Sequence, residues 1–342
     1  MKIVKYLLFL ILIVFIAGSI YVATKDGDFS AESSRLMDAP APMLYKELAD
    51  LSNWKSWEAW SGLDGTNVDL SPETSGEGAE MAWTSDEIRD GKITTLSGIP
   101  YKQLQQELVM NTIIGEAEAN ITWTLKPEGN QTRVTWRMEG SEDFKEKLAF
   151  TLQEDDLPEV LQPIFEKSLE DLEANVIRKM EEYSVNVDGL TEHGGGYYMY
   201  STTAARLGEV NSRAANMIEQ VRNYMQDNNI SISGKPFVIY NRRDERNGTS
   251  IFSAAVPTPS QVITPEGSSV LNGYLAPQKV VKTTLKGNHK NAAEAWEKTY
   301  RYIEQNGLQV DPQGQPFEIY ITDPAEEDNP ALWITEIYIP VL

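Results

Sequence analysis

The sequence predicts an α+β protein: an N-terminal transmembrane helix, an antiparallel sheet that grips a long C-terminal helix, and a duplicated βαββ domain. Three observations predict this fold. Residues 6–24 carry no charge, alternating segments between 28 and 142 precede an amphipathic stretch, and a seven-residue motif recurs 80 residues later. At 342 residues the chain is long enough for two domains, each with its own core.

Composition and charge narrow the possible functions. The 51 acidic and 30 basic residues give a net charge of −21, which repels nucleic acid and anionic lipid headgroups and favours a cationic or neutral small partner. The chain has no cysteine and two histidines, so thiolate chemistry, disulfides and multi-histidine metal sites are excluded. We therefore expect no metal, no cofactor and no nucleic-acid partner, and the sequence carries no signal for an oligomeric state.

The uncharged run "YLLFLILIVFIAGSIYVAT" at residues 6–24 is 19 residues long and would span roughly 28 Å as a helix. Lys2 and Lys5 precede it. Residues 1–25 are therefore predicted to form a single-pass membrane anchor, with the N-terminus cytoplasmic and the soluble domains extracytoplasmic, that is, periplasmic. A cleaved signal peptide is the alternative, because small residues occupy positions 17–19. The apolar stretch continues past that site, which favours the anchor.

Residues 26–186 are predicted to form the first soluble domain. Segments with strand-like alternation run from residue 28 to residue 142. In "ITWTL" and "VTWRM", Trp123 and Trp136 share one apolar face, which the amphipathic stretch "LPEVLQPIFEKSLEDLEANVIRKMEEY" covers as a helix. The interior candidates, which could be packed core or the lining of a ligand pocket, are Met81, Trp83, Trp123, Trp136 and Met138.

Residues 187–196 are predicted to be a linker, because "VNVDGLTEHGGGYY" lacks periodicity and contains three consecutive glycines. Residues 197–342 then contain an internal repeat: "GKPFVIY" at 234–240 returns as "GQPFEIY" at 314–320. Each copy follows a strand and an amphipathic helix, and precedes a strand that ends in proline. Asn229 and Gly307 suit left-handed helix caps. The repeat predicts two βαββ units in one sheet, with both helices on the same face.

Both halves resemble known families. Residues about 28–183, through "DAPAPMLYKELADLSNWKSWEAW" and "SLEDLEANV", resemble the START-like (SRPBCC, polyketide-cyclase-like) helix-grip fold. That resemblance implies an apolar ligand between sheet and helix, and a minority of such proteins are enzymes. Residues about 197–342, through "GQPFEIYITDP" and "TEIYIPV", resemble the GyrI-like (gyrase-inhibitor-like) effector-binding domain of bacterial regulators. This implies a small, often cationic or amphipathic molecule held between the two halves. No helix-turn-helix accompanies it, which argues against DNA binding.

Glu336, in "ITEIYIP", is the first candidate site residue. Alternation places it on the face of Ile334 and Tyr338. Counting back from the closing proline, it corresponds to Ser253 in the first copy, so the duplicated scaffold does not require a carboxylate here. A carboxylate beside aromatic rings suits a cationic ligand, and the GyrI-like resemblance implies the same role. The alternative is an edge-strand charge that faces water.

The aromatic residues of residues 197–342 supply the other ligand-binding candidates, for each of which core packing is the alternative. They are Tyr338, Trp296, Tyr300, Tyr320, Tyr198 and Tyr200. No catalytic or metal-ligating residue is predicted. His193 and His289 are interpreted as surface or cap residues, and "TDPAEEDNP" as a solvated acidic loop rather than a calcium site.

The predicted function is that of a membrane-anchored small-molecule-binding protein. Its C-terminal domain takes an amphipathic, cationic ligand, and its START-like domain takes an apolar one. One alternative is a hydrolase or cyclase with Glu336 as general base. The other is a lipid-carrying or partner-docking module at the membrane.

Overall fold

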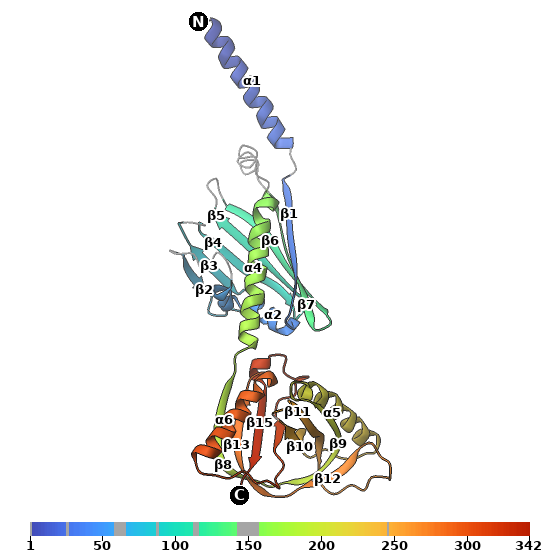
Figure 1. The fold of residues 1–342 in the computed structure, drawn as a ribbon. Helices are drawn as coiled ribbons and strands as arrows, with labels where there is room; N and C mark the ends of the chain where they lie inside the picture. Colours follow the sequence, from blue (N-terminus) through green and yellow to red (C-terminus); the bar gives the residue numbers. More distant parts are fainter. Residues whose placement is uncertain are drawn as a thin grey trace. The chain divides into compact units, whose positions relative to one another are not determined.

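The structure, a computed structural model, describes residues 2–24, 27–57, 66–86, 89–111, 116–141, 157–244 and 246–342. The chain divides into two compact α+β units, Met1–Arg178 and Lys179–Leu342 (Figure 1). The predicted anchor falls on helix α1 (Lys2–Thr24), but the side chains of residues 1–11 and of residue 15 lie outside the described part. Across the residues that could be assessed, no helix is long and apolar enough to cross a membrane.

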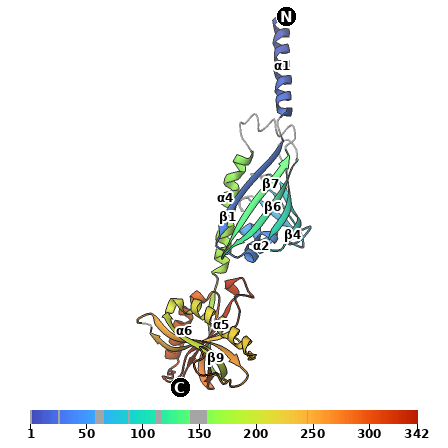
Figure 2. The same cartoon turned by 90° about the vertical axis from the view of Figure 1, so that its right-hand side faces the viewer.

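The first unit is a seven-stranded antiparallel sheet with strand order β1-β7-β6-β5-β4-β3-β2. Its strands are β1 (Asp28–Met37), β2 (Asn67–Leu70), β3 (Glu80–Thr84), β4 (Gly91–Ile99), β5 (Gln103–Asn111), β6 (Glu116–Glu128) and β7 (Gln131–Ser141). Helix α2 (Ala41–Ala49) and the 3-10 turn η1 (Leu51–Ser56) follow β1, and α4 (Leu157–Met180) lies along one face of the sheet (Figure 2). This is the predicted arrangement of sheet and helix, while membership of the START-like family stays a prediction.

The core of the first unit is a stack of aromatic rings between sheet and helix. Trp123 stacks on Trp136 with 4.6 Å between ring centroids, and Trp136 stacks on Phe165 of α4 at 4.1 Å. Trp54 of η1 meets Trp123 edge-on at 6.1 Å. All four side chains are fully buried, so the apolar face predicted from "ITWTL" and "VTWRM" is confirmed. Trp60, from the same sequence segment as Trp54, lies outside the described residues.

The second unit is an eight-stranded antiparallel sheet with strand order β12-β9-β11-β10-β14-β15-β13-β8. The first repeat comprises β9 (Gly196–Arg206), η2 (Leu207–Glu209), α5 (Val210–Asp227), β10 (Phe237–Asp244) and β11 (Thr249–Thr258). The second comprises β13 (Gln278–Lys286), η3 (His289–Asn291), α6 (Ala292–Gln305), β14 (Phe317–Tyr320), η4 (Pro330–Leu332) and β15 (Ile334–Pro340). Strands β10 and β14 pair at the centre of the sheet, and β12 (Leu271–Leu275) and β8 (Ser184–His193) form its edges. The duplicated βαββ prediction is confirmed.

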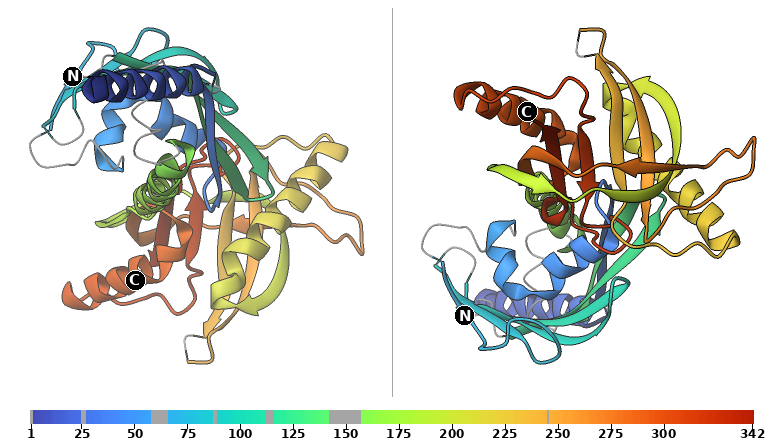
Figure 3. Two further views of the ribbon diagram at one scale, coloured as in Figure 1. Left: turned by 90° about the horizontal axis from the view of Figure 1, so that it is seen from above. Right: turned by 90° about the horizontal axis from the view of Figure 1, so that it is seen from below.

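Both helices of the second unit lie on one face of its sheet, as predicted. Helix α5 packs on β9 and β11, and α6 packs on β13, β8 and β15, so each helix covers its own repeat (Figure 3). Apolar residues of the two helices and of the sheet belong to one continuous core. Asn229 and Gly307 have φ values of 55° and 65°, which confirms the two predicted left-handed caps.

The predicted linker at 187–196 is wrong for most of its length. Residues up to His193 belong to β8, which pairs with β13, and the second unit begins at Lys179. Strand β8 lies at the sheet edge, where Gly189 is buried and Val185 and Val187 are only partly buried against the core, so its apolar alternation is too short to distinguish it from a linker. A register shift leaves Asp188 as an extra residue there, and Gly189 has a φ of 98°, which glycine tolerates best.

Candidate functional site

The two faces of the second sheet divide the predicted ligand-binding residues. On the face away from the helices lie Tyr198, Tyr200, Glu336 and Tyr338. On the helix-covered side lie Trp296, Tyr300 and Tyr320. Because side chains alternate between faces along each strand, these seven residues form two separate clusters rather than one site.

Glu336 is held in an ion pair rather than left without a partner. Lys282 on β13 places its Nζ 2.7 Å from Oε1 of Glu336, and the Tyr338 hydroxyl donates to Oε2 at 2.6 Å. The two charged side chains are partly accessible, with 19% of Glu336 and 27% of Lys282 exposed. The Lys282 ammonium also lies 6.0 Å from the centroid of the Tyr338 ring. The carboxylate thus already holds a cation beside an aromatic ring.

Aromatic rings extend from Glu336 across both repeats; we call this set, Tyr198, Tyr200, Phe237, Phe317 and Tyr338, the aromatic face. Phe317 stacks almost parallel on Tyr338, with 4.8 Å between centroids and 8° between planes. Phe237 links Phe317 at 6.3 Å to Tyr198 at 5.2 Å, and Tyr200 lies 5.5 Å from Tyr198. Burial raises the pKa of Tyr198 to about 12, so its hydroxyl stays neutral at ordinary pH. The aromatic face is therefore an uncharged surface with one carboxylate, that of Glu336, beside its last ring, Tyr338.

His193 packs against the aromatic face and is not a surface residue, so its interpretation from the sequence was wrong. Its ring lies 4.8 Å from Phe317 and 5.3 Å from Tyr338 between centroids. Burial lowers the pKa of His193, and the charge of Glu336 opposes that effect. The sequence did not predict that His193 lies beside the aromatic face, because His193 is the last residue of β8 and three glycines follow it, as in a linker.

A second carboxylate, Glu318 on β14, lies on the helix-covered side. It is 1% exposed and accepts hydrogen bonds from Trp296 Nε1, from the Tyr240 hydroxyl at 3.0 Å and from the Tyr320 hydroxyl at 3.4 Å. Burial raises its pKa, while the hydrogen bonds and the charge of Arg243 act against that rise. We call these five residues the Glu318 cluster.

Sequence reasoning missed Glu318, although the repeat contains the signal. Position 318 in "GQPFEIY" corresponds to Val238 in "GKPFVIY", and the two residues are Cα partners at the centre of the sheet. The same comparison that distinguishes Glu336 from Ser253 therefore distinguishes Glu318 from Val238. Both carboxylates belong to the second copy alone.

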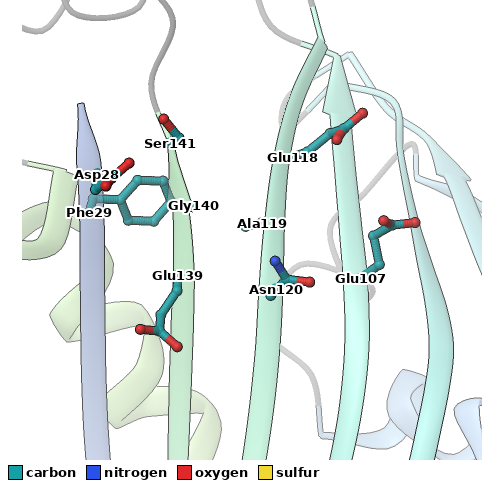
Figure 4. A pocket seen from close by; sticks show the side chains of 9 residues that line it. All are labelled: Asp28, Phe29, Glu107, Glu118, Ala119, Asn120, Glu139, Gly140 and Ser141. Carbon is teal, nitrogen blue, oxygen red and sulfur yellow. The ribbon is translucent and has the colours of Figure 1, made fainter.

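The first unit has an open hollow of about 510 Å³ where β1, β7, β6 and β5 run side by side. Its lining includes Asp28, Glu107, Glu118 and Glu139, whose carboxylates are spread over neighbouring strands (Figure 4). The described residues contain no group of three or more histidine, cysteine, aspartate or glutamate side chains placed to hold a metal ion. A second open hollow of about 670 Å³ lies between β1 and α4 and has a polar lining that includes Glu32, Arg35 and Lys167. Neither lining combines a carboxylate with several aromatic rings, so we take the second unit as the candidate site.

Comparison with known proteins agrees with the GyrI-like assignment of the second unit. Residues 200–342 match the family described as the GyrI-like small molecule binding domain. No curated protein is significantly similar to the chain.

Solved structures show weaker likenesses. A protein from Chromobacterium violaceum is 16% identical, over 43% of this chain and 96% of its own, with a TM-score of 0.34. The C-terminal domain of EcmrR is 16% identical, over 47% and 98%, with a TM-score of 0.40. EcmrR in a DNA complex is 14% identical, over 58% and 77%, with a TM-score of 0.40.

Proposed function

We propose that the second unit binds a small amphipathic cation on its aromatic face, with Glu336 as the counter-charge. The observation that carries this proposal is the Lys282–Glu336 ion pair beside the Tyr338 ring. A cation that takes the place of Lys282 keeps the Glu336 charge paired, and the Lys282 ammonium, whose side chain is 27% exposed, can move into solvent. Four rings of the aromatic face are already buried and only Tyr200 is partly exposed, so the ligand gains mainly from the charge of Glu336 and from cation–π attraction to Tyr338.

The contacts of Glu336 favour binding over the hydrolase or cyclase alternative. A general base needs a free carboxylate oxygen within reach of the proton that it removes. Here Oε1 faces Lys282 and Oε2 accepts from Tyr338. An apolar ligand in the first unit is also part of the proposal. Because the stack of Trp123, Trp136 and Phe165 fills the space between sheet and helix, such a ligand would bind by displacing part of that stack.

The test uses a panel of lipophilic cations, such as tetraphenylphosphonium and alkyltrimethylammonium ions, with calorimetry as the readout. Glu336→Gln is expected to weaken binding about tenfold or more, which corresponds to about 1.4 kcal/mol. Lys282→Met is expected to strengthen it several-fold, because the competing cation is removed. The matched controls are Glu192→Gln and Lys286→Met, which change the same charges at exposed positions of β8 and β13. Unchanged affinity in both Glu336→Gln and Lys282→Met would overturn the proposal.

The proposal also includes membrane attachment through residues 1–25, with both units on the extracytoplasmic side. It is supported by the uncharged run at 6–24, which follows Lys2 and Lys5. A C-terminal alkaline phosphatase fusion is expected to be active and to stay in the membrane fraction after a carbonate wash. An inactive fusion would reverse the orientation, and a soluble product lacking the first residues would show that the run is a cleaved signal.

A further inference from the structure

Another carboxylate, that of Asp188, lies beside the Lys282–Glu336 ion pair. Strands β15, β13 and β8 run side by side (Figure 1) and carry Glu336, Lys282 and Asp188 in that order. Thr284, the Cα partner of Glu336 on β13, donates its hydroxyl to Oδ2 of Asp188 at 2.6 Å. Burial raises the pKa of Tyr338, and the charges of Glu336 and Asp188 raise it further. Lys282 therefore lies on the strand between two carboxylates, on the same side of the sheet as both.

A bulge in β8 places Asp188 next to Lys282. Gly189 pairs with Lys282, and the preceding paired residue of β8 is Val187, so Asp188 is the extra residue between them. In a bulge, two residues of one strand oppose one residue of the other. The φ of 98° at Gly189 is one that glycine adopts readily. Because the lysine side chain has a flexible four-carbon stem, the Lys282 ammonium can turn from β15 toward β8.

These three charged groups are one positive charge short of balance. Glu336 and Asp188 are both acidic, and the Lys282 ammonium is paired with Glu336. Asp188 is exposed and accepts hydrogen bonds from two neutral groups, the Thr284 hydroxyl and the Asn186 amide, the latter at 2.5 Å. Within the described part of the chain it has no ion pair. A singly charged external cation at Glu336 would therefore leave both carboxylates paired if Lys282 moved to Asp188.

We propose that Asp188 receives the Lys282 ammonium when an external cation takes its place at Glu336. This inference rests on the function proposed for Glu336 and adds a positioning residue to that site. The lysine exchanges one carboxylate for another instead of remaining unpaired, which makes its displacement more favourable. Asp188 thus promotes binding without touching the ligand. The ligand class that suits this exchange is a cation with a single positive charge, because one such charge neutralises the second carboxylate.

The binding test is a double-mutant cycle in the full chain, with tetraphenylphosphonium as the probe and calorimetry as the readout. Asp188→Asn removes the charge but keeps an acceptor oxygen for Thr284. We expect it to weaken binding about threefold or more in the wild-type background, the size of a partly exposed ion pair. In the Lys282→Met background, where no ammonium needs a new partner, the same change should alter affinity by less than about twofold.

Glu192→Gln is the matched control, because it removes a charge from another exposed position of β8. It should change affinity by less than about twofold in both backgrounds, because exposed charges at a distance are screened by salt. An equal loss for Asp188→Asn in both backgrounds would mean that Asp188 acts on the ligand itself. No loss in either background would mean that Lys282 does not use Asp188. Each of these two results would overturn the proposal.

Zero-length cross-linking tests the transfer of Lys282 without a ligand. A carbodiimide joins an amine to a carboxylate that it contacts, and mass spectrometry identifies the linked residues. The Lys282–Glu336 link should predominate in wild type. Glu336→Gln is expected to raise the Lys282–Asp188 link about threefold or more, and saturating tetraphenylphosphonium should do the same in wild type.

The cross-links also separate this inference from the function on which it rests. An unchanged Lys282–Asp188 link in Glu336→Gln would overturn the role of Asp188, whatever the protein binds. A raised link in Glu336→Gln, together with no binding of any lipophilic cation to wild type, would support Asp188 as the second partner of Lys282. That combination would instead overturn the function proposed for Glu336.

Discussion

Trp136→Ala is expected to destabilise the first unit by about 3–5 kcal/mol, the range for truncating a large buried aromatic residue. Trp136 is fully buried and stacks on Trp123 on one side and on Phe165 of α4 on the other. Its removal therefore separates the sheet from its covering helix. Hydrogen exchange followed by mass spectrometry, under mild denaturant, should show faster exchange in residues 28–141 and 157–178 and little change in the second unit.

The neighbouring residue Arg137 provides the matched control for Trp136→Ala. Its side chain points away from the helix, is 47% exposed and pairs with Glu139 at 2.7 Å. Because exposed ion pairs are worth between 0 and about 1 kcal/mol, Arg137→Ala should change stability by less than about 1 kcal/mol. Similar losses in Arg137→Ala and Trp136→Ala would contradict the packing argument.

Trp136→Ala also tests the proposal that the first unit binds an apolar ligand. The space left by the indole is lined by aromatic rings, and an apolar cavity of this kind stays dry and takes up small apolar molecules. We expect added indole to recover part of the lost stability. Recovery would show that the space between sheet and α4 can hold an apolar guest once it is vacated. No effect of indole would count against an apolar site there.

Acid is expected to destabilise the second unit through His289. The ring stacks on Trp333 with 4.9 Å between centroids, and its Nδ1 lies 2.8 Å from Oγ1 of Thr335. Burial lowers the pKa of His289 from 6.5 to about 4. Because the folded state binds the proton more weakly than the unfolded state does, the stability from neutral His289 is present above pH 6.5. It is lost as the pH falls from 6.5 toward 4, by about 2 kcal/mol between pH 7 and pH 5.

Urea unfolding at pH 7 and pH 5 tests this expectation, with His289→Phe as the variant. Phenylalanine keeps the stack on Trp333 but cannot titrate, so the loss between the two pH values should shrink by about 2 kcal/mol relative to wild type. The chain has two histidines, so His193→Phe is the matched control. Its effect should be smaller, because the charge of Glu336 opposes the lowering of the His193 pKa. Equal losses in wild type and His289→Phe would contradict the assignment.

Local patterns were sufficient to predict most elements and the face on which each residue lies. Period-two alternation placed Trp123 and Trp136 on the inner face of the first sheet, and it placed Glu336 with Tyr338 in the last strand. The repeat predicted the duplicated unit and its helices. These signals are local, because burial of one face imposes a period on the sequence of a single helix or strand. The linker prediction was wrong at β8, an edge strand in which only Val185 and Val187 alternate as apolar residues before the bulge at Asp188 interrupts the pattern.

The partners of the two carboxylates were decided by the tertiary structure alone. Lys282 reaches Glu336 because β13 pairs with β15 in a particular register, and a bulge in β10 turns Arg243 toward the side of the sheet that carries Tyr240 and Trp296. Pairing register and bulges depend on contacts between strands far apart in the chain, and a one-residue change reverses the face of every later side chain. The sequence by itself determined that the second copy carries two carboxylates absent from the first. Only the folded sheet decided that Glu336 pairs with Lys282, that Glu318 accepts hydrogen bonds from Trp296 and two tyrosines, and that the two carboxylates lie on opposite sides of the sheet.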